Sequence, residues 1–255
     1  MLVLTSDWKN FPEKASLQED EAHVWTVFLP ELASRQETLA RILSTDERDR
    51  AGRFQFPRDA QNYTLSHGAL RIILSGYVNL PPSALRFAYN SQGKPEIAGA
   101  MPAGRIHFNL THSCDLAMVA IANGGPIGID VEKLKAPLAD AQVASFFSPG
   151  EIAVLRSLSP STRTEVFFHC WTRKEAYLKA RGDGLSFPLH RFEVSLAEPP
   201  PEDWLRVEGH AEEGKRWRLF SLKPAPGYLA ALVVPRQVVN VISCPSISLD
   251  SLTNY

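Results

Sequence analysis

The chain has 255 residues, of which 44% are hydrophobic and 22% are charged, so it can bury a substantial core and is not a disordered chain. Lysine and arginine number 27 against 28 aspartates and glutamates, a net charge of −1. This balance argues against broad nucleic-acid binding or a polybasic membrane surface, so any anion site must be a local cluster.

The three cysteines, Cys114, Cys170 and Cys244, are widely spaced and form no C-x-x-C pair. They predict neither a disulfide framework nor a zinc or redox motif, and they favour a reducing, cytoplasmic compartment. The start of the chain lacks the features of a signal peptide. The strongest apolar runs, 117–122 and 228–234, are far shorter than the ~20 residues of a membrane span. We therefore expect a soluble cytoplasmic protein.

The first half of the chain predicts a strand at 24–29 and two helices. Ser44 with Glu47 three residues later is typical of a capping box at a helix start. Apolar residues at helical spacing predict a longer helix over about 59–77. The stretch 106–121 predicts a hairpin that turns at 113–115.

The second half begins after the turn at 123–126 with a short apolar strand at 127–129. Thr162 and Glu165 predict a second capping box, followed by a helix of about 20 residues that stops at Gly182. Three further strands are expected, at 191–196, 217–222 and 228–234.

This order of elements predicts an α+β fold of two similar α/β halves related by a pseudo-twofold axis, with a small antiparallel-rich sheet packed on a long helix in each. The expected boundary divides the chain into residues 1–125 and 126–255. The alternative is that the likeness of the halves is a chance order found in many α+β chains.

The segment Ile129-Asp130-Val131-Glu132 places two carboxylates on one face of a strand, because side chains alternate between the faces. Two neighbouring carboxylates repel each other unless water or a cation screens them, and Mg²⁺ suits such a pair together with substrate phosphates. The alternative is an exposed acidic edge neutralised by Lys133 and Lys135.

Lys174 lies near the middle of an apolar helical arc that includes Phe167, Trp171 and Leu178. An unpaired ammonium group there costs several kcal/mol, so a carboxylate or a bound phosphate must compensate it. Glu175 and Lys179 lie one turn apart, a spacing that by itself indicates only helix support worth ~0.2–0.5 kcal/mol.

Other candidate residues are less specific. Lys94 lies on a rigid turn between Gly93 and Pro95, and His112 lies in the predicted hairpin, where a lone histidine is more often structural. The sequence has no phosphate-binding glycine loop, H-E-x-x-H zinc motif or G-x-S-x-G nucleophile elbow. A basic cluster, usually just a solvated face, comprises Arg48, Arg50, Arg53 and Arg58.

Four segments together resemble the Sfp-type 4′-phosphopantetheinyl transferases. The pair G-I-D-x-E and W-x-x-K-E-A-x-x-K, about 40 residues apart, is the specific part of the match. The similarity covers roughly residues 45–235, with Gly93-Lys94-Pro95 upstream and Gly184-Leu185-Ser186 downstream. The four segments are Phe108-Asn109-Leu110-Thr111-His112-Ser113, Ile127-Gly128-Ile129-Asp130-Val131-Glu132, Phe146-Phe147-Ser148-Pro149-Gly150-Glu151 and Trp171-Thr172-Arg173-Lys174-Glu175-Ala176-Tyr177-Leu178-Lys179.

The resemblance implies transfer of the phosphopantetheine arm of coenzyme A to a serine of an acyl or peptidyl carrier protein, with release of 3′,5′-ADP. It implies that Asp130, Glu132 and Glu175 hold Mg²⁺ on the pyrophosphate of coenzyme A. Glu175 and Lys179 are the implied catalytic residues, with Glu175 as the base for the carrier serine. Charge neutralisation rather than a covalent nucleophile suits this reaction.

The resemblance also implies a set of coenzyme A contacts. Lys174 and Lys179 would face the pyrophosphate, and Pro95 would lie near the adenine. The contacts to the 3′-phosphate end would be Lys94, His112 and Arg53. One departure is Asn62, where many members carry a further basic residue, a loss for which Arg53 or Arg58 compensates. The implied contacts are Arg53, Lys94, Pro95, His112, Lys174 and Lys179, of which Lys174 and Lys179 are the pyrophosphate pair.

Since each half supplies part of the site, we expect a functional monomer that binds neither nucleic acid nor membrane. Two alternatives stay open. Another coenzyme A-dependent acyltransferase would have no need for Asp130 and Glu132, and a catalytically inactive carrier-binding module would have no reason to retain all three carboxylates.

Overall fold

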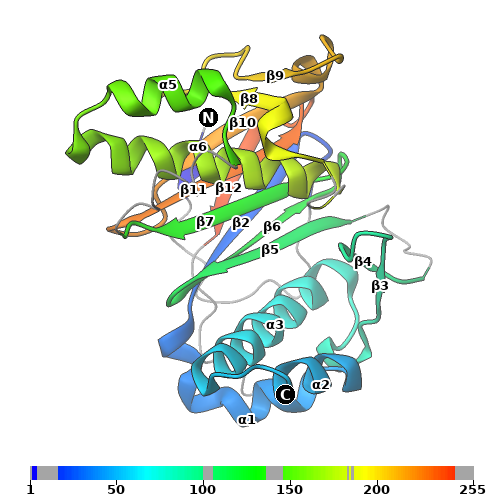
Figure 1. Ribbon diagram of the computed structural model, residues 1–255. Helices are drawn as coiled ribbons and strands as arrows, with labels where there is room; N and C mark the ends of the chain where they lie inside the picture. The colour runs from blue at the N-terminus through cyan, green and yellow to red at the C-terminus, as the bar shows by residue number, and fades with distance from the viewer. Residues whose placement is uncertain are drawn as a thin grey trace.

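The structure is a computed structural model that describes residues 2–4, 17–99, 106–135, 146–182, 184 and 187–244. Figure 1 shows α5 and α6 on one side of the molecule and α1, α2 and α3 on the other, with most strands between them. The main sheet has the order β1-β12-β2-β6-β5, and a second has the order β10-β11-β7. Two small sheets pair β3 with β4 and β8 with β9.

The elements up to residue 122 are β1 (Leu2–Leu4), β2 (Glu21–Phe28), η1 (Leu29–Arg35), α1 (Gln36–Ile42), α2 (Thr45–Gly52), α3 (Pro57–Val78), η2 (Pro82–Ala84), β3 (Phe87–Tyr89), β4 (Pro95–Ile97), β5 (His107–Ser113) and β6 (Leu116–Ala122). The later ones are β7 (Gly128–Lys133), α5 (Pro149–Ser157), α6 (Pro160–Arg181), η4 (Leu189–Arg191), β8 (Phe192–Val194), β9 (Leu205–Val207), η5 (Glu213–Arg216), β10 (Trp217–Leu222), β11 (Tyr228–Pro235) and β12 (Asn240–Cys244).

The long helix α3 packs on the main sheet through a shared core with β2, β5 and β6. Its start at Pro57 and its left-handed cap at Asn79 explain its length. The predicted hairpin of β5 and β6 is confirmed, with Cys114 in the left-handed region at its turn. Asn62, the residue that departs from the family pattern, donates to the Cys114 carbonyl (2.9 Å), while Arg58 pairs with Asp115 (2.8 Å).

The predicted capping box of α2 is also confirmed, since Ser44 Oγ accepts from the Glu47 amide and Glu47 accepts from the Ser44 amide. The same oxygen of Glu47, Oε2, lies buried 2.7 Å from the Arg71 guanidinium, and Oε1 lies 3.3 Å from His67 Nδ1. Burial acts to raise the pKa of Glu47, but hydrogen bonds from His67 and Ser44 and the charge of Arg71 outweigh it and hold the pKa at about 2. This carboxylate ties α2 to α3.

In the second half, α6 packs on β7 and β11. The prediction that Thr162 caps this helix was wrong: Pro160 is its first residue, and Ser159 caps it by accepting from the Thr162 amide. Proline fits that first position because its missing N–H has no partner there in any case. The end at Gly182 is as predicted, with φ +79°.

The two halves are interleaved rather than merely adjacent. β12 lies parallel to β2 and between β1 and β2, so a strand of the second half is part of the sheet of the first half. A third apolar cluster joins the inner faces of the two larger sheets. The α+β class is confirmed, with α3 packed on the five-stranded sheet and α6 packed on the three-stranded sheet.

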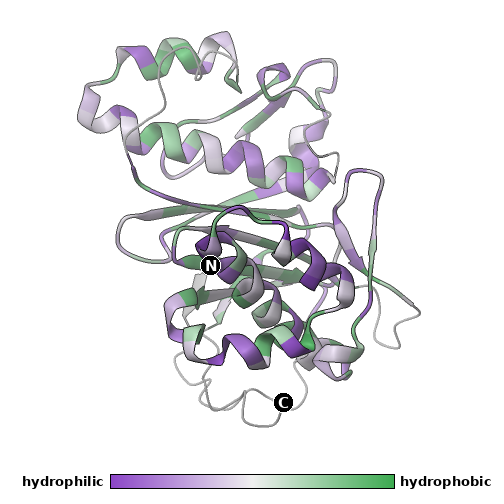
Figure 2. Cartoon of the chain, turned by 60° about the horizontal axis from the view of Figure 1, so that its bottom comes forward, coloured by the Kyte–Doolittle hydropathy of each residue, from purple (hydrophilic) through white to green (hydrophobic). Residues whose placement is uncertain are grey.

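The hydropathy pattern agrees with this layering. Figure 2 shows hydrophilic and hydrophobic residues alternating along the helices, as expected where one face packs on a sheet and the other meets water. Across the described ranges of the chain, no helix combines the length and apolar character needed to cross a membrane.

Candidate active site

The site begins with the close contact between β7 and α6. A Cβ on Gly128 would lie 2.0 Å from the carbonyl oxygen of Ala176 and 2.3 Å from the amide nitrogen of Ala180. Only glycine therefore allows the strand to touch the helix backbone at this point. Since alternate strand residues share a face, Asp130 and Glu132 are directed to the same side as Gly128, toward α6.

Asp130 is the buried centre of the site. Its Oδ1 accepts from Lys179 Nζ at 2.6 Å and from Thr111 Oγ1 at 3.2 Å. Its Oδ2 is buried and has no hydrogen-bond partner among the described residues. Burial raises the pKa of Asp130 to about 6. Repulsion from Glu132 and Glu175 adds to this upward shift, and the charge and hydrogen bond of Lys179 oppose it.

This geometry rules out one of the two interpretations of the acidic pair. The exposed acidic edge neutralised by Lys133 and Lys135 is wrong, because Asp130 is 5% exposed and pairs with Lys179. A buried carboxylate oxygen without a donor is costly, and a cation would satisfy it.

Glu132 and Glu175 flank Asp130. Glu132 is half-buried and accepts from Ser113 Oγ at 2.8 Å. Burial raises the pKa of the half-buried Glu175; Lys179 opposes the shift and Glu132 adds to it. In the described part of the chain, no three acidic, histidine or cysteine side chains form a ready metal cluster. Glu132 and Glu175 are nevertheless close enough for their charges to act on Asp130, and carboxylate oxygens are the kind of donors that Mg²⁺ takes.

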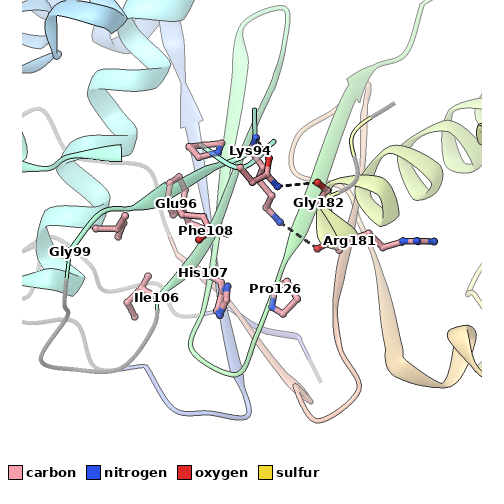
Figure 3. A pocket seen from close by; sticks show the side chains of 13 residues that line it. Lys94, Glu96, Gly99, Ile106, His107, Phe108, Pro126, Arg181 and Gly182 are labelled. Atoms are coloured by element: carbon pink, nitrogen blue, oxygen red, sulfur yellow. Dashed lines mark hydrogen bonds between the residues drawn. The ribbon is translucent and has the colours of Figure 1, made fainter. Parts of the chain in front are cut away.

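A cavity of about 290 Å³ opens beside these groups, lined by Glu175, Lys179, Asn109 and the Lys94-Pro95 turn. A second and larger cavity, of about 770 Å³, lies along the same turn (Figure 3). The turn therefore separates two hollows, of which the smaller contains the candidate catalytic side chains.

Hydrogen bonds hold the Lys94 turn against the C-terminal end of α6. Lys94 Nζ donates to the carbonyls of Ile127 (3.1 Å), Lys179 and Ala180, and Asn90 donates to the Gly182 carbonyl at 3.0 Å (Figure 3). A cation at the C-terminal end of a helix is stabilised by the helix dipole. Burial lowers the pKa of Lys94 to about 8, against the opposing charge of Glu96.

Comparisons with known proteins fit this geometry. Residues 30–123 match the family model for the 4′-phosphopantetheinyl transferase N-terminal domain, and residues 126–233 match that for the 4′-phosphopantetheinyl transferase superfamily. The 4′-phosphopantetheinyl transferase HetI of Nostoc is 37% identical over 91% of this chain and 95% of its own length. The chain belongs to the 4′-phosphopantetheinyl transferase superfamily.

Other relatives in the superfamily agree. The 4′-phosphopantetheinyl transferase Sfp of Bacillus subtilis is 32% identical over 68% of this chain and 76% of its own length. The human L-aminoadipate-semialdehyde dehydrogenase-phosphopantetheinyl transferase is 30% identical over 73% of this chain and 65% of its own length. The predicted family and the predicted enzyme class are confirmed.

One residue predicted from the superfamily motif requires a correction. Lys174, expected to face the pyrophosphate, is fully buried, and its ammonium lies 2.8 Å from the Glu151 carboxylate. It also donates to the carbonyls of Leu189 (2.8 Å) and Phe192 (2.6 Å). The anion that its burial requires is thus a carboxylate of the protein, and Lys174 joins α5 and β8 to α6.

Arg53 and His112 lie outside both cavities. Arg53 is exposed and lines a depression of about 560 Å³ on α2 and α3, together with Arg50, Tyr63 and Tyr89. His112 is exposed on β5. The structure therefore brings Asp130, Glu132, Glu175 and Lys179 together, places Lys94 and Pro95 beside them, and leaves Arg53 apart. His112 lines neither cavity, but it is close enough to Lys179 and Glu132 for their charges to act on its pKa, which desolvation lowers.

The residue-by-residue reasoning missed the role of β5. From sequence, Asn109, Thr111 and Ser113 were named only as part of the superfamily motif. Their side chains in fact form hydrogen bonds to β7, and Thr111 and Ser113 donate to the carboxylates of Asp130 and Glu132. The available signal was the alternation of polar residues in an otherwise apolar hairpin, a pattern that predicts one polar face along a strand.

Proposed function

We propose that this enzyme transfers the 4′-phosphopantetheine arm of coenzyme A to a serine hydroxyl of an acyl or peptidyl carrier protein, with Mg²⁺ held by Asp130, Glu132 and Glu175. The observation that carries the proposal is the buried, unpartnered Oδ2 of Asp130 beside two further carboxylates. Membership of the superfamily supplies the reaction, and the donor set suits a hard divalent cation.

In the proposed reaction the serine oxygen forms a bond to the β-phosphorus of coenzyme A while the bond to 3′,5′-ADP breaks. Glu175 accepts the hydroxyl proton, a role that burial assists because it raises the pKa of this carboxylate. Lys179 supplies positive charge beside Asp130, where phosphate oxygens would lie. A bound Mg²⁺ would neutralise charge on the pyrophosphate.

The remaining coenzyme A contacts are also part of the proposal. The Lys94-Pro95 turn lines the cavity of Glu175 and Lys179, so the turn is well placed for the nucleotide, with the Lys94 ammonium itself engaged by three carbonyls. Arg53 and His112 offer exposed cationic or polar groups for the 3′-phosphate end. Lys174 is not included, because its ammonium is fully engaged inside the protein.

We further propose a monomer of two halves, 1–125 and 126–255, that works in the cytoplasm. Support for the boundary is that the two family models meet between residues 123 and 126. Support for the monomer is that β5 and the Lys94 turn come from the first half and Glu175 from the second, so one chain carries the whole site. The three free cysteines agree with a reducing compartment. Light scattering that finds an obligate trimer would contradict the monomer.

The test is mass spectrometry of apo-carrier proteins after incubation with coenzyme A and Mg²⁺. The proposal predicts that a carrier gains the mass of the arm and that 3′,5′-ADP is released. In a parallel incubation with acyl-coenzyme A, transfer of only the acyl group would favour the acyltransferase alternative. Carrier binding without any mass gain, across all carriers tested, would favour an inactive binding module.

A further inference from the structure

The edges of the two larger sheets face each other along β5 and β7. β7 is the last strand of the three-stranded sheet and β5 is the last strand of the five-stranded sheet, and the two lie in contact (Figure 1). Side chains of β5 span the gap to the backbone of β7. Asn109 accepts from the Ile129 amide (2.8 Å), Thr111 from the Val131 amide (3.4 Å) and Ser113 from the Lys133 amide (3.2 Å).

These contacts fix where two hydroxyl protons go. A hydroxyl group has one proton to donate and two lone pairs to accept with. Because Ser113 Oγ accepts from the Lys133 amide, its proton is directed to Glu132 Oε2, 2.8 Å away. Thr111 repeats this pattern two residues earlier, where it accepts from the Val131 amide and donates to Asp130 Oδ1 at 3.2 Å.

The type of side chain at each of these β5 positions matches the β7 residue opposite it. Thr111 and Ser113 carry hydroxyls opposite Asp130 and Glu132, the two carboxylates of the strand. Asn109, one step earlier, lies where the corresponding β7 residue is Gly128, which has no side chain to hold. A hydroxyl group thus stands at each position that faces a carboxylate.

We propose that Ser113 and Thr111 are positioning residues that orient the Glu132 and Asp130 carboxylates toward a divalent cation. This inference rests on the proposed function. Each hydroxyl connects a carboxylate to the fixed backbone of the strand that carries it, so the carboxylate oxygens not held by a hydroxyl stay directed into the site. Ser113 is the cleaner probe, because Thr111 also accepts from Lys179 Nζ at 3.3 Å.

The experiment measures cation affinity without transfer, in the full-length protein with coenzyme A and no carrier. Mn²⁺ is titrated by electron paramagnetic resonance, and Mg²⁺ by its competition with Mn²⁺. The expected result is a 10–100-fold weaker affinity in Ser113→Ala, the range seen when a partner of a metal-ligating side chain is lost. Ser113→Thr, which keeps the hydroxyl, should restore affinity to within about threefold of wild type.

The matched control is Ser157→Ala. Ser157 also donates its proton, to the Val154 carbonyl at 2.7 Å, but it lies on α5. Its loss should leave cation affinity unchanged. If Ser113→Ala does not fold, Ser113→Cys keeps a side chain of similar shape with a weak donor and should also lower the affinity.

Two results would overturn the inference alone: Ser113→Ala within twofold of wild type, or Ser113→Thr as weak as Ser113→Ala. A wild-type protein that binds no cation with coenzyme A would overturn the proposed metal site and the inference together. The wild-type titration therefore separates the failure of the proposed function from the failure of the positioning role.

Discussion

Lys174→Met tests the structural assignment that differs most from the sequence prediction. Methionine keeps much of the length of the lysine side chain and removes its charge. In the structure the ammonium satisfies the Glu151 carboxylate and two carbonyls, and it lies 4.3 Å from the centre of the Phe192 ring. Lys174 is 0% exposed and the Glu151 side chain is 2% exposed, so water cannot replace the lost partner.

The expected cost follows from this burial. Removal of one partner of a buried ion pair leaves an uncompensated charge and costs about 3–5 kcal/mol. That is a large share of the roughly 5–15 kcal/mol by which a folded domain is stable. The double variant Lys174→Met with Glu151→Gln leaves no buried charge at this point, so its cost should be below the sum of the single costs by about 1–3 kcal/mol.

The assay is urea unfolding of the wild type, both single variants and the double variant, with coenzyme A affinity measured on each folded protein by calorimetry. The structure predicts a large loss of stability and a coenzyme A affinity within about threefold of wild type. A Lys174→Met variant of unchanged stability that binds coenzyme A tenfold more weakly, about 1.4 kcal/mol, would refute the reasoning.

Three further predictions concern contacts that hold elements of the fold together. Gly128→Ala forces a Cβ into the α6 backbone and should lower the unfolding free energy by about 1–3 kcal/mol in urea, whereas Gly52→Ala, with open space around it, should not. Glu47→Gln removes a carboxylate whose pKa of about 2 lies below its ordinary 4.5, a shift worth about 3 kcal/mol of stability above pH 4.5 that is lost as the pH falls toward 2. The difference in unfolding free energy between wild type and Glu47→Gln should therefore narrow by about 1 kcal/mol from pH 7 to pH 3.5, and a constant difference would argue against a lowered pKa of Glu47. Lys94→Met leaves the carbonyls of Ile127, Lys179 and Ala180 without this donor and should lower the unfolding free energy by about 1–3 kcal/mol, so an unchanged value would mean that the turn is not held by Lys94.

The parts of the fold that sequence predicted are those with local causes. The long helices follow from apolar spacing within each segment, and the capping box of Ser44 and Glu47 needs only four residues. Alternation along one strand was likewise enough to place Asp130 and Glu132 on a common face. The wrong prediction for the start of α6 also has a local cause, because Ser159-Pro160 is a second helix-start signal close to Thr162.

What sequence could not decide depends on long-range packing. The burial of Lys174 was predictable and so was its need for an anion, but only the fold shows that α5 brings Glu151 to it. No local pattern in the sequence predicts that β12 pairs with β2 in the sheet of the first half. The same holds for the facing edges of β5 and β7, because the packing of two sheets decides which edges meet.

The account is tested most directly by the dependence of carrier modification on Mg²⁺ in the wild type and in Asp130→Asn, with the exposed Glu202→Gln as control. A cation that stabilises developing charge contributes several kcal/mol, so removal of the metal with a chelator or of its central carboxylate should slow the mass gain of an apo-carrier by at least about 100-fold. Glu202→Gln should match the wild type. Modification that resists the chelator, or a near-wild-type rate for folded Asp130→Asn, would contradict the claim that these carboxylates hold the catalytic cation.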